Sequence, residues 1–186
     1  IIDQNNFYIP TSDKNLNQTI SVSGKKSINL PLGEVKISRA VKTLDVIIRT
    51  CSSVNMLTQS KKRIFERDKI EYTLRSINSI LRSIIYSREY HPNVNIKITV
   101  IDHNSTNEDL EKIKSLLNSS ATQFKLLNLD ISQIENKIKK INEKNEETIP
   151  NQISNMSSIY KSLMLSRHSE DLVYFVEDDY IHELES

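Results

Sequence analysis

Glycine is scarce in this chain of 186 residues, which contains only Gly24 and Gly33. Both lie within the Asn-, Ser- and Lys-rich first 40 residues, so the rest of the chain has neither a G-x-G-x-x-G turn nor a Walker A loop. This absence argues against a dinucleotide-dependent dehydrogenase and against a P-loop enzyme. If the protein binds phosphate groups, it must hold them in another way.

Cysteine, long apolar runs and excess charge are also lacking. Cys51 is the single cysteine, so no intramolecular disulfide can form. No apolar stretch approaches the roughly 20 residues that a membrane-spanning helix needs. The net charge of +1 implies no general attraction to nucleic acid. We therefore expect a soluble cytoplasmic protein, with a peripheral association with a membrane left open.

The two ends of the chain suggest a piece of a longer protein. The first residue is Ile1, and the last six residues, "IHELES", read as the start of a helix. We expect residues 1–40 to be a lead-in with short strands or partial order. Residues 41–186 are then expected to form the folded domain.

Apolar patterning is regular after residue 40. Short buried-type runs predict strands, and apolar stripes at helical spacing predict helices between them. The strands are expected at residues 43–50, 95–102, 124–130 and 171–176, and the helices from Ile70 to the His91–Pro92 pair, over 104–117 and 131–147, and after Pro150. Ser105 and Glu108 match a capping box at the start of the second helix. Because strands and helices alternate, the fold class is α/β, with a mostly parallel central sheet and helices on both faces.

Polar clusters follow three of the predicted strands, namely "TCSS" at 50–53, "DHNS" at 102–105 and "EDDY" at 177–180. Parallel sheets carry their sites at the carboxyl ends of the strands, so these clusters should meet at one edge. The three acids of the last cluster repel one another, and no Lys or Arg follows Arg167. Mg²⁺ or Mn²⁺, carrying a diphosphate, would supply the missing positive charge.

The order and spacing of these segments resemble the nucleotide-sugar glycosyltransferases of the Rossmann-like GT-A fold, close to the large inverting family 2. The resemblance covers about residues 43 to 180. It rests on four segments that match the family's first strand and loop, its first helix, its second strand with an acidic turn, and its Asp-x-Asp metal motif: "VIIRTCSS", "EYTLRSINSILRSI", "VIDHNSTNEDL" and "YFVEDDY".

The resemblance implies a role for each matching residue. Asp102 would hydrogen-bond the nucleotide base, and Thr50 would line the base pocket. Asp179 would bind the metal directly, together with Glu177 as the other outer acid of the motif. The resemblance also implies nucleotide-sugar contacts from Ser52, Asn155 and Asp178. Either Glu177 or Asp178 would contact the ribose or a bound water.

Several positions depart from the family pattern. His103 and Asn104 replace an Asp and a Gly of the second motif, and Asn can adopt the left-handed backbone that such a Gly provides. Arg49 and Cys51 are atypical in the first loop. Residues 54–68 form a polar insertion between that loop and the first helix.

The function predicted from the resemblance is metal-dependent, hexosyltransferase-like transfer of a sugar from a nucleotide-diphosphate donor. The acceptor, whether glycan, lipid or protein, is unknown, and no nucleic acid is expected as a partner. The resemblance places the catalytic base and the acceptor site beyond residue 186. We therefore expect this chain to be the donor-binding half of the enzyme, truncated after the metal motif and inactive by itself.

Two simpler interpretations stay open. The chain could be a non-catalytic α/β domain, a degenerate transferase that binds a nucleotide or a glycan without chemistry. The acids at 177–179 could merely cap a following helix, and Asp102 could merely shape a turn.

Overall fold

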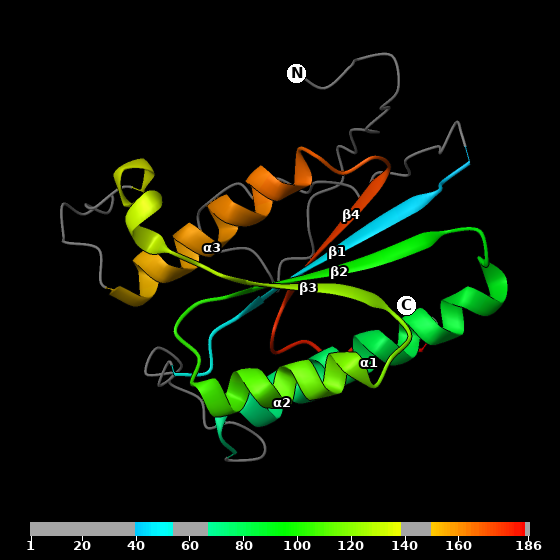
Figure 1. Ribbon diagram of the computed structural model, residues 1–186, viewed down its shortest axis with the longest axis horizontal. Helices are drawn as coiled ribbons and strands as arrows, with labels where there is room; N and C mark the ends of the chain where they lie inside the picture. Colours follow the sequence, from blue (N-terminus) through cyan, green and yellow to red (C-terminus); the bar gives the residue numbers. More distant parts are fainter. Residues whose placement is uncertain (1–39, 54–66, 139–149, 185–186) are drawn as a thin grey trace, which may run out of the picture. The chain divides into compact units, whose positions relative to one another are not determined.

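A computed structural model of the chain describes residues 40–53, 67–138 and 150–184 (Figure 1). The chain divides into two units, Ile1–Ala40 and Val41–Ser186, and the expected lead-in lies almost wholly outside the described residues. The elements of the second unit are β1 (Thr43–Thr50), α1 (Lys69–Tyr90), β2 (Asn95–Asp102), α2 (Asn107–Asn118), β3 (Gln123–Asn128), the 3-10 turns η1 (Ile131–Gln133) and η2 (Glu135–Lys137), α3 (Pro150–Ser166) and β4 (Leu172–Glu177).

The four strands form one sheet in the order β3-β2-β1-β4, and every neighbouring pair is parallel. The chain moves outward from β1 to β2 and β3, and then returns to place β4 on the other side of β1. The strand order therefore reverses between β1 and β4. In open parallel sheets, ligands bind outside the carboxyl ends of the strands at such a reversal.

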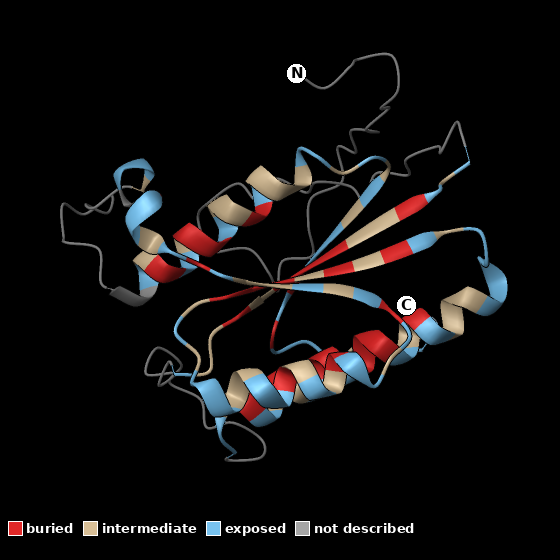
Figure 2. Ribbon diagram, in the orientation of Figure 1, coloured by how far each residue is buried: buried red, intermediate tan, exposed pale blue. Residues whose placement is uncertain are grey.

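Helices cover both faces of this sheet, as the alternation of apolar segments predicts (Figure 1). Successive residues of a strand point to opposite faces, so Ile47 and Ile48 of β1 belong to different cores. Ile48 packs in the core beneath α1 and α2, whereas Ile47 packs in a smaller core with Tyr160 of α3. Figure 2 shows the buried residues of β1 and β2, the two central strands.

The described helices do not include one that is both long enough and apolar enough to cross a membrane. The expected helix over 131–147 is wrong in its described part, which forms η1 and η2 instead. Asp130 explains the start of this departure, because its Oδ1 accepts hydrogen bonds from the Ser132 amide at 3.0 Å and from the Ser132 hydroxyl at 2.6 Å. Such an Asx turn offers the backbone an alternative to the helix. Residues 139–149 lie outside the described residues.

The predicted capping box at Ser105 and Glu108 is also wrong. Thr106 is the N-cap of α2, and its side chain accepts a hydrogen bond from the Asp109 amide at 3.1 Å. The N-cap lies one residue later than predicted, because the Ser105 hydroxyl is bonded to Asp102 instead. Asn104 does adopt the left-handed backbone suggested for it, with φ of 64°.

Candidate functional site

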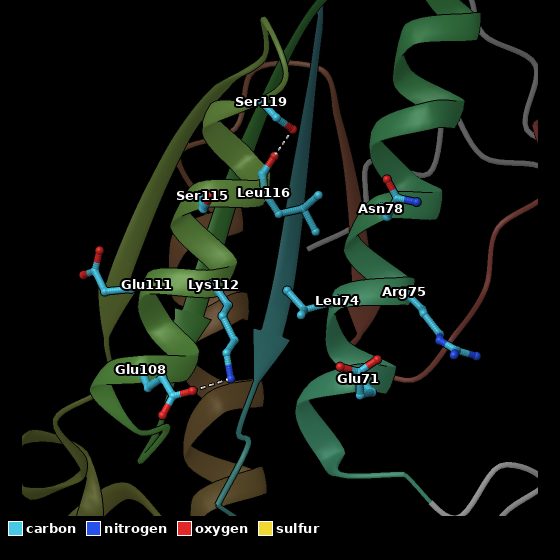
Figure 3. Close-up of a pocket in the computed structure, with 10 residues that line it drawn as sticks. All are labelled: Glu71, Leu74, Arg75, Asn78, Glu108, Glu111, Lys112, Ser115, Leu116 and Ser119. Atoms are coloured by element: carbon cyan, nitrogen blue, oxygen red, sulfur yellow. Dashed lines mark hydrogen bonds and ion pairs between the residues drawn. The ribbon is translucent and has the colours of Figure 1, made fainter.

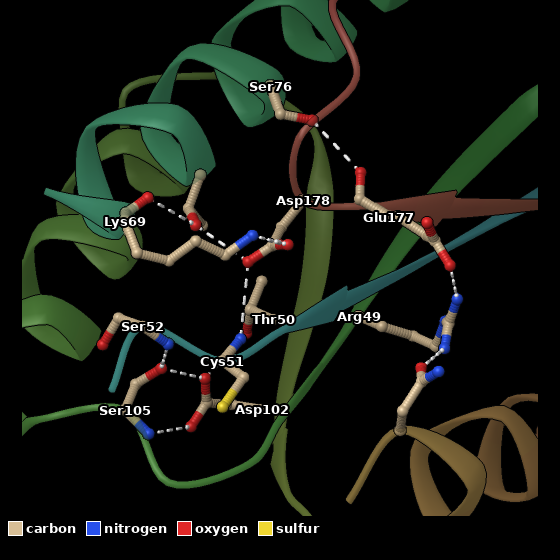
Figure 4. A network of polar contacts seen from close by, with 12 residues as sticks. Arg49, Thr50, Cys51, Ser52, Lys69, Ser76, Asp102, Ser105, Glu177 and Asp178 are labelled. Atoms are coloured by element: carbon tan, nitrogen blue, oxygen red, sulfur yellow. Dashed lines mark hydrogen bonds and ion pairs between the residues drawn. The ribbon is translucent and has the colours of Figure 1, made fainter. Parts of the chain in front are cut away.

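The ends of β1 and β2 are joined through the Asp102 carboxylate, which is 2% exposed. Its Oδ1 accepts hydrogen bonds from the Thr50 hydroxyl at 2.7 Å and from the Ser105 hydroxyl at 2.5 Å. Its Oδ2 accepts a hydrogen bond from the Ser105 amide at 3.2 Å. The structure thus brings Thr50 and Asp102 together, with the Asp102 carboxylate already engaged by three protein donors (Figure 4).

Ser52 lies beside this cluster. Its amide donates a hydrogen bond to the Ser105 hydroxyl at 2.9 Å. Its own hydroxyl oxygen is buried and has no hydrogen-bond partner among the described residues. A buried polar atom without a partner is costly, so this hydroxyl is a group that a bound ligand could satisfy.

Asp178 joins the end of β4 to the start of α1. Its Oδ1 accepts from the Lys69 ammonium at 2.6 Å, and its Oδ2 accepts from the Thr73 hydroxyl at 2.8 Å and the Cys51 amide at 3.4 Å. The Lys69 and Asp178 side chains are only 11% and 10% exposed. The charge of Asp178 is therefore balanced inside the fold.

Glu177 points to the opposite face of the sheet, toward α3, because neighbouring residues of a strand alternate in direction. Its carboxylate forms an ion pair with Arg49, and its side chain is 50% exposed. The same guanidinium donates from Nη1 to the Asn155 side-chain oxygen at 2.8 Å and to the Ser158 hydroxyl at 3.3 Å. Through Arg49, the structure places Asn155 next to Glu177. Figure 4 shows Glu177 directed toward Arg49 and Asp178 directed toward Lys69.

Asp179, the predicted metal ligand, is exposed. No hydrogen bond or ion pair joins its side chain to the part of the chain that the structure describes. Since it follows Asp178 directly, it lies at the same edge of the sheet as Cys51. Of the three acids, it is the one whose carboxylate is left available to a ligand.

Serines of α1 hold the segment that follows the acids. The Ser76 hydroxyl donates to the Glu177 carbonyl at 3.4 Å, the Ser83 hydroxyl donates to the Glu183 carbonyl at 2.8 Å, and the His182 amide donates to the Ser79 hydroxyl at 3.0 Å. These contacts fix the path of the chain beyond the acids against α1.

Two histidines flank the site, and burial lowers the pKa of each. The His182 ring lies between the Tyr174 hydroxyl, 2.8 Å from Nε2, and the Ser79 hydroxyl, 3.4 Å from Nδ1. His103 Nδ1 lies 2.7 Å from the Ser154 hydroxyl of α3. Burial lowers the pKa of His103, and the nearby negative charge of Asp102 opposes that shift.

Comparisons of this chain with protein-family models, with curated proteins and with solved structures found no match. The family resemblance of the sequence motifs therefore stays a prediction.

Sequence reasoning missed the two cations of the site, Arg49 and Lys69. Arg49 stood out only as a departure from the family pattern, and Lys69, which directly follows the polar insertion at 54–68, was not singled out. Each pairs with an acid more than 100 residues away in the chain. The one available signal was the acidic triplet itself, because adjacent like charges require partners.

One pocket of the described residues lies beside the acidic end of β4, and a larger pocket lies away from the strand ends. A pocket of about 650 Å³ beside β4 is lined by Arg49 and Glu177 together with the aromatic rings of Tyr174, Phe175 and Tyr180. A larger one, of about 940 Å³, lies between α1 and α2 (Figure 3). None of its lining residues belongs to the clusters above, so we place the candidate site at the strand ends.

Proposed function

We propose that this chain binds the nucleotide-diphosphate part of a sugar donor at the carboxyl edge of its sheet, as a segment of a metal-dependent glycosyltransferase. One observation carries the proposal: polar ends of three strands, far apart in the sequence, are bonded together where the strand order reverses. Thr50 is joined to Asp102, and Asp178 is joined to the Cys51 amide. Ligands of parallel α/β proteins bind at this position.

The nucleotide base would lie over the ends of β1 and β2. Ser52 supports this placement, because its buried hydroxyl has no partner among the described residues. Asp102 already accepts three hydrogen bonds, so it acts on the base mainly by fixing Thr50 and Ser105, which surround it.

A divalent metal fits the acidic end of β4 only in part. Among the described residues, no group of three or more His, Cys, Asp and Glu side chains could hold an ion. Asp179 offers an exposed carboxylate as a ligand, and Glu177 offers a second, half-exposed one that is paired with Arg49 in this structure. Mg²⁺ is commonly bound by one or two carboxylates with substrate phosphates supplying further ligands. When bound in this way, the ion would stabilise charge on the leaving diphosphate.

A second candidate is a binding domain without chemistry. The observation that favours it is the engagement of Asp102 and Asp178 by protein donors, which leaves few free carboxylates for catalysis. Such a domain would have no need of a metal ion, so the two candidates differ in metal dependence.

The test is calorimetric titration of the full chain with a panel of nucleoside diphosphates, with and without Mn²⁺. We expect binding that needs Mn²⁺, that is lost in Asp179→Asn, and that persists in Glu89→Gln, a matched change of an exposed acid on α1. Nucleotide binding that is independent of Mn²⁺ and survives Asp179→Asn would favour the second candidate. Absence of any nucleotide binding would refute the first candidate and would leave the second only as a glycan-binding domain.

A further inference from the structure

We infer that Arg49 is a phosphate-binding residue of this site, held by Glu177 in the ligand-free protein and transferred to the ligand's diphosphate on binding. The inference rests on the proposed function and adds to it a residue that lies outside the acidic and base-binding motifs. It comes from the position and the contacts of Arg49 and from the exposure of its partner Glu177.

Position is the first support. Arg49 lies opposite Glu177 in the pairing of β1 with β4, and the next residue, Thr50, lies opposite Asp102 in the pairing of β1 with β2. The Arg49 side chain points toward α3, on the face of the sheet opposite to Thr50 and Asp102, so it reaches the strand ends from the acidic side, beside Glu177. It also lines the pocket of about 650 Å³ beside β4.

The contacts of Arg49 are the second support. Nη1 donates to Asn155 and Ser158 of α3, and Nη2 donates to Glu177. These three contacts use at most three of the five N–H groups of a guanidinium. The two α3 contacts fix the plane of the fork in advance, which reduces the ordering cost of binding a phosphate in the bidentate geometry that Arg favours.

The exposure of the paired acids is the third support, because the two cations are themselves shielded to a similar degree, with side chains 14% exposed for Arg49 and 11% for Lys69. Glu177 is 50% exposed, so water reaches its carboxylate and screens the pair with Arg49, and another anion can take its place. Lys69 and its partner Asp178 are both buried, and the Asp178 carboxylate has two further donors. Arg49 is thus the exchangeable cation of the site, and Lys69 is the structural one.

The exchange links the metal to the diphosphate. If Glu177 were a ligand of a bound divalent metal, Arg49 would lose its anion, and its guanidinium would be free to donate to phosphate oxygens. Each ligand therefore makes the site more favourable for the other, and this coupling must be reciprocal.

The experiment measures the affinity of the full chain for a nucleoside and for the matching nucleoside diphosphate, both with Mn²⁺. Arg49→Met should weaken diphosphate binding by at least about tenfold, as expected for the loss of hydrogen bonds to a charged group, and leave nucleoside binding unchanged. Arg49→Lys keeps the charge without the fork and should lose part of that affinity. Arg167→Met, at an exposed cation after α3, is the matched control and should change neither affinity.

Circular dichroism and thermal unfolding establish that each variant is folded. If Arg49→Met does not fold, Arg49→Lys alone is used for the binding comparison. Equal diphosphate affinity in native protein and both variants would overturn the role of Arg49 and leave the proposed function standing. Equal weakening of nucleoside and diphosphate would also overturn it, by assigning Arg49 a structural role. A native chain that binds no nucleoside diphosphate would refute the proposed function itself.

Discussion

Asp178 and Asp179 are neighbours of identical chemistry, and the structure predicts opposite consequences of changing them. Asp178→Asn removes the negative charge from a pair whose side chains are about one-tenth exposed and leaves the Lys69 ammonium without its counterion. Breaking a buried ion pair by removing one partner costs about 3–5 kcal/mol. Asn still offers an oxygen to Thr73 and to the Cys51 amide, so we expect the lower end, about 3 kcal/mol.

The assay is urea unfolding followed by circular dichroism, with linear extrapolation and a check that the slope is unchanged. A loss of about 3 kcal/mol corresponds to a fall in melting temperature of roughly 6–12 °C for a chain of this size. The double variant Lys69→Met with Asp178→Asn removes the stranded charge, so it should be more stable than Asp178→Asn alone. The single variant Lys69→Met completes the cycle from which the coupling energy is calculated.

Asp179→Asn changes an exposed carboxylate that is bonded to none of the described residues. Its free energy of unfolding should stay within about 0.5 kcal/mol of the native value, while metal-dependent nucleotide binding is lost. If Asp178→Asn unfolds at the native urea concentration, the buried pair that we describe does not exist in solution. A large destabilisation by Asp179→Asn would equally contradict the assignment of the two acids.

Three further predictions concern pH, capping and the metal. Because burial lowers the pKa of His182 and of His103, the unfolded chain binds protons more readily than the folded one. The free energy of unfolding should therefore be full above about pH 6.5 and fall as the pH drops through the lowered pKa values. His182→Gln should reduce the accompanying fall in melting temperature between pH 7.5 and 5. Thr106→Ala should cost about 1 kcal/mol in urea unfolding, whereas Glu108→Ala should cost less than about 0.5 kcal/mol, and the reverse order would restore the capping box that the structure replaces. Mn²⁺ titrated alone should give little calorimetric heat, with binding appearing only when a nucleoside diphosphate is added, since the described residues offer too few ligands by themselves.

Much of the fold could be predicted from local sequence. The bounds of β1 and β2 agree with their predicted ranges, because β-branched runs that are buried on both faces leave few alternatives to a central parallel strand. The strand–helix alternation likewise implied helices on both faces of the sheet. Two predictions were wrong because a side chain formed a competing hydrogen bond. The Asp130 side chain bonds to Ser132 and produces a 3-10 turn where a helix was expected, and Ser105 bonds to Asp102 instead of capping α2.

The sequence by itself determined that polar groups follow three strands and that these ends share one edge of the sheet, since parallel strands leave no other arrangement. It could not tell which of the three acids would be paired with a cation, because all three carry the same charge and stand next to one another. Tertiary structure decided this, through the alternation of side chains at the end of β4: Glu177 faces Arg49 on the α3 side, Asp178 faces Lys69 on the α1 side, and Asp179 is left exposed. Partners more than 100 residues away become neighbours only when the sheet forms, and so the available acid and the exchangeable cation are properties of the fold.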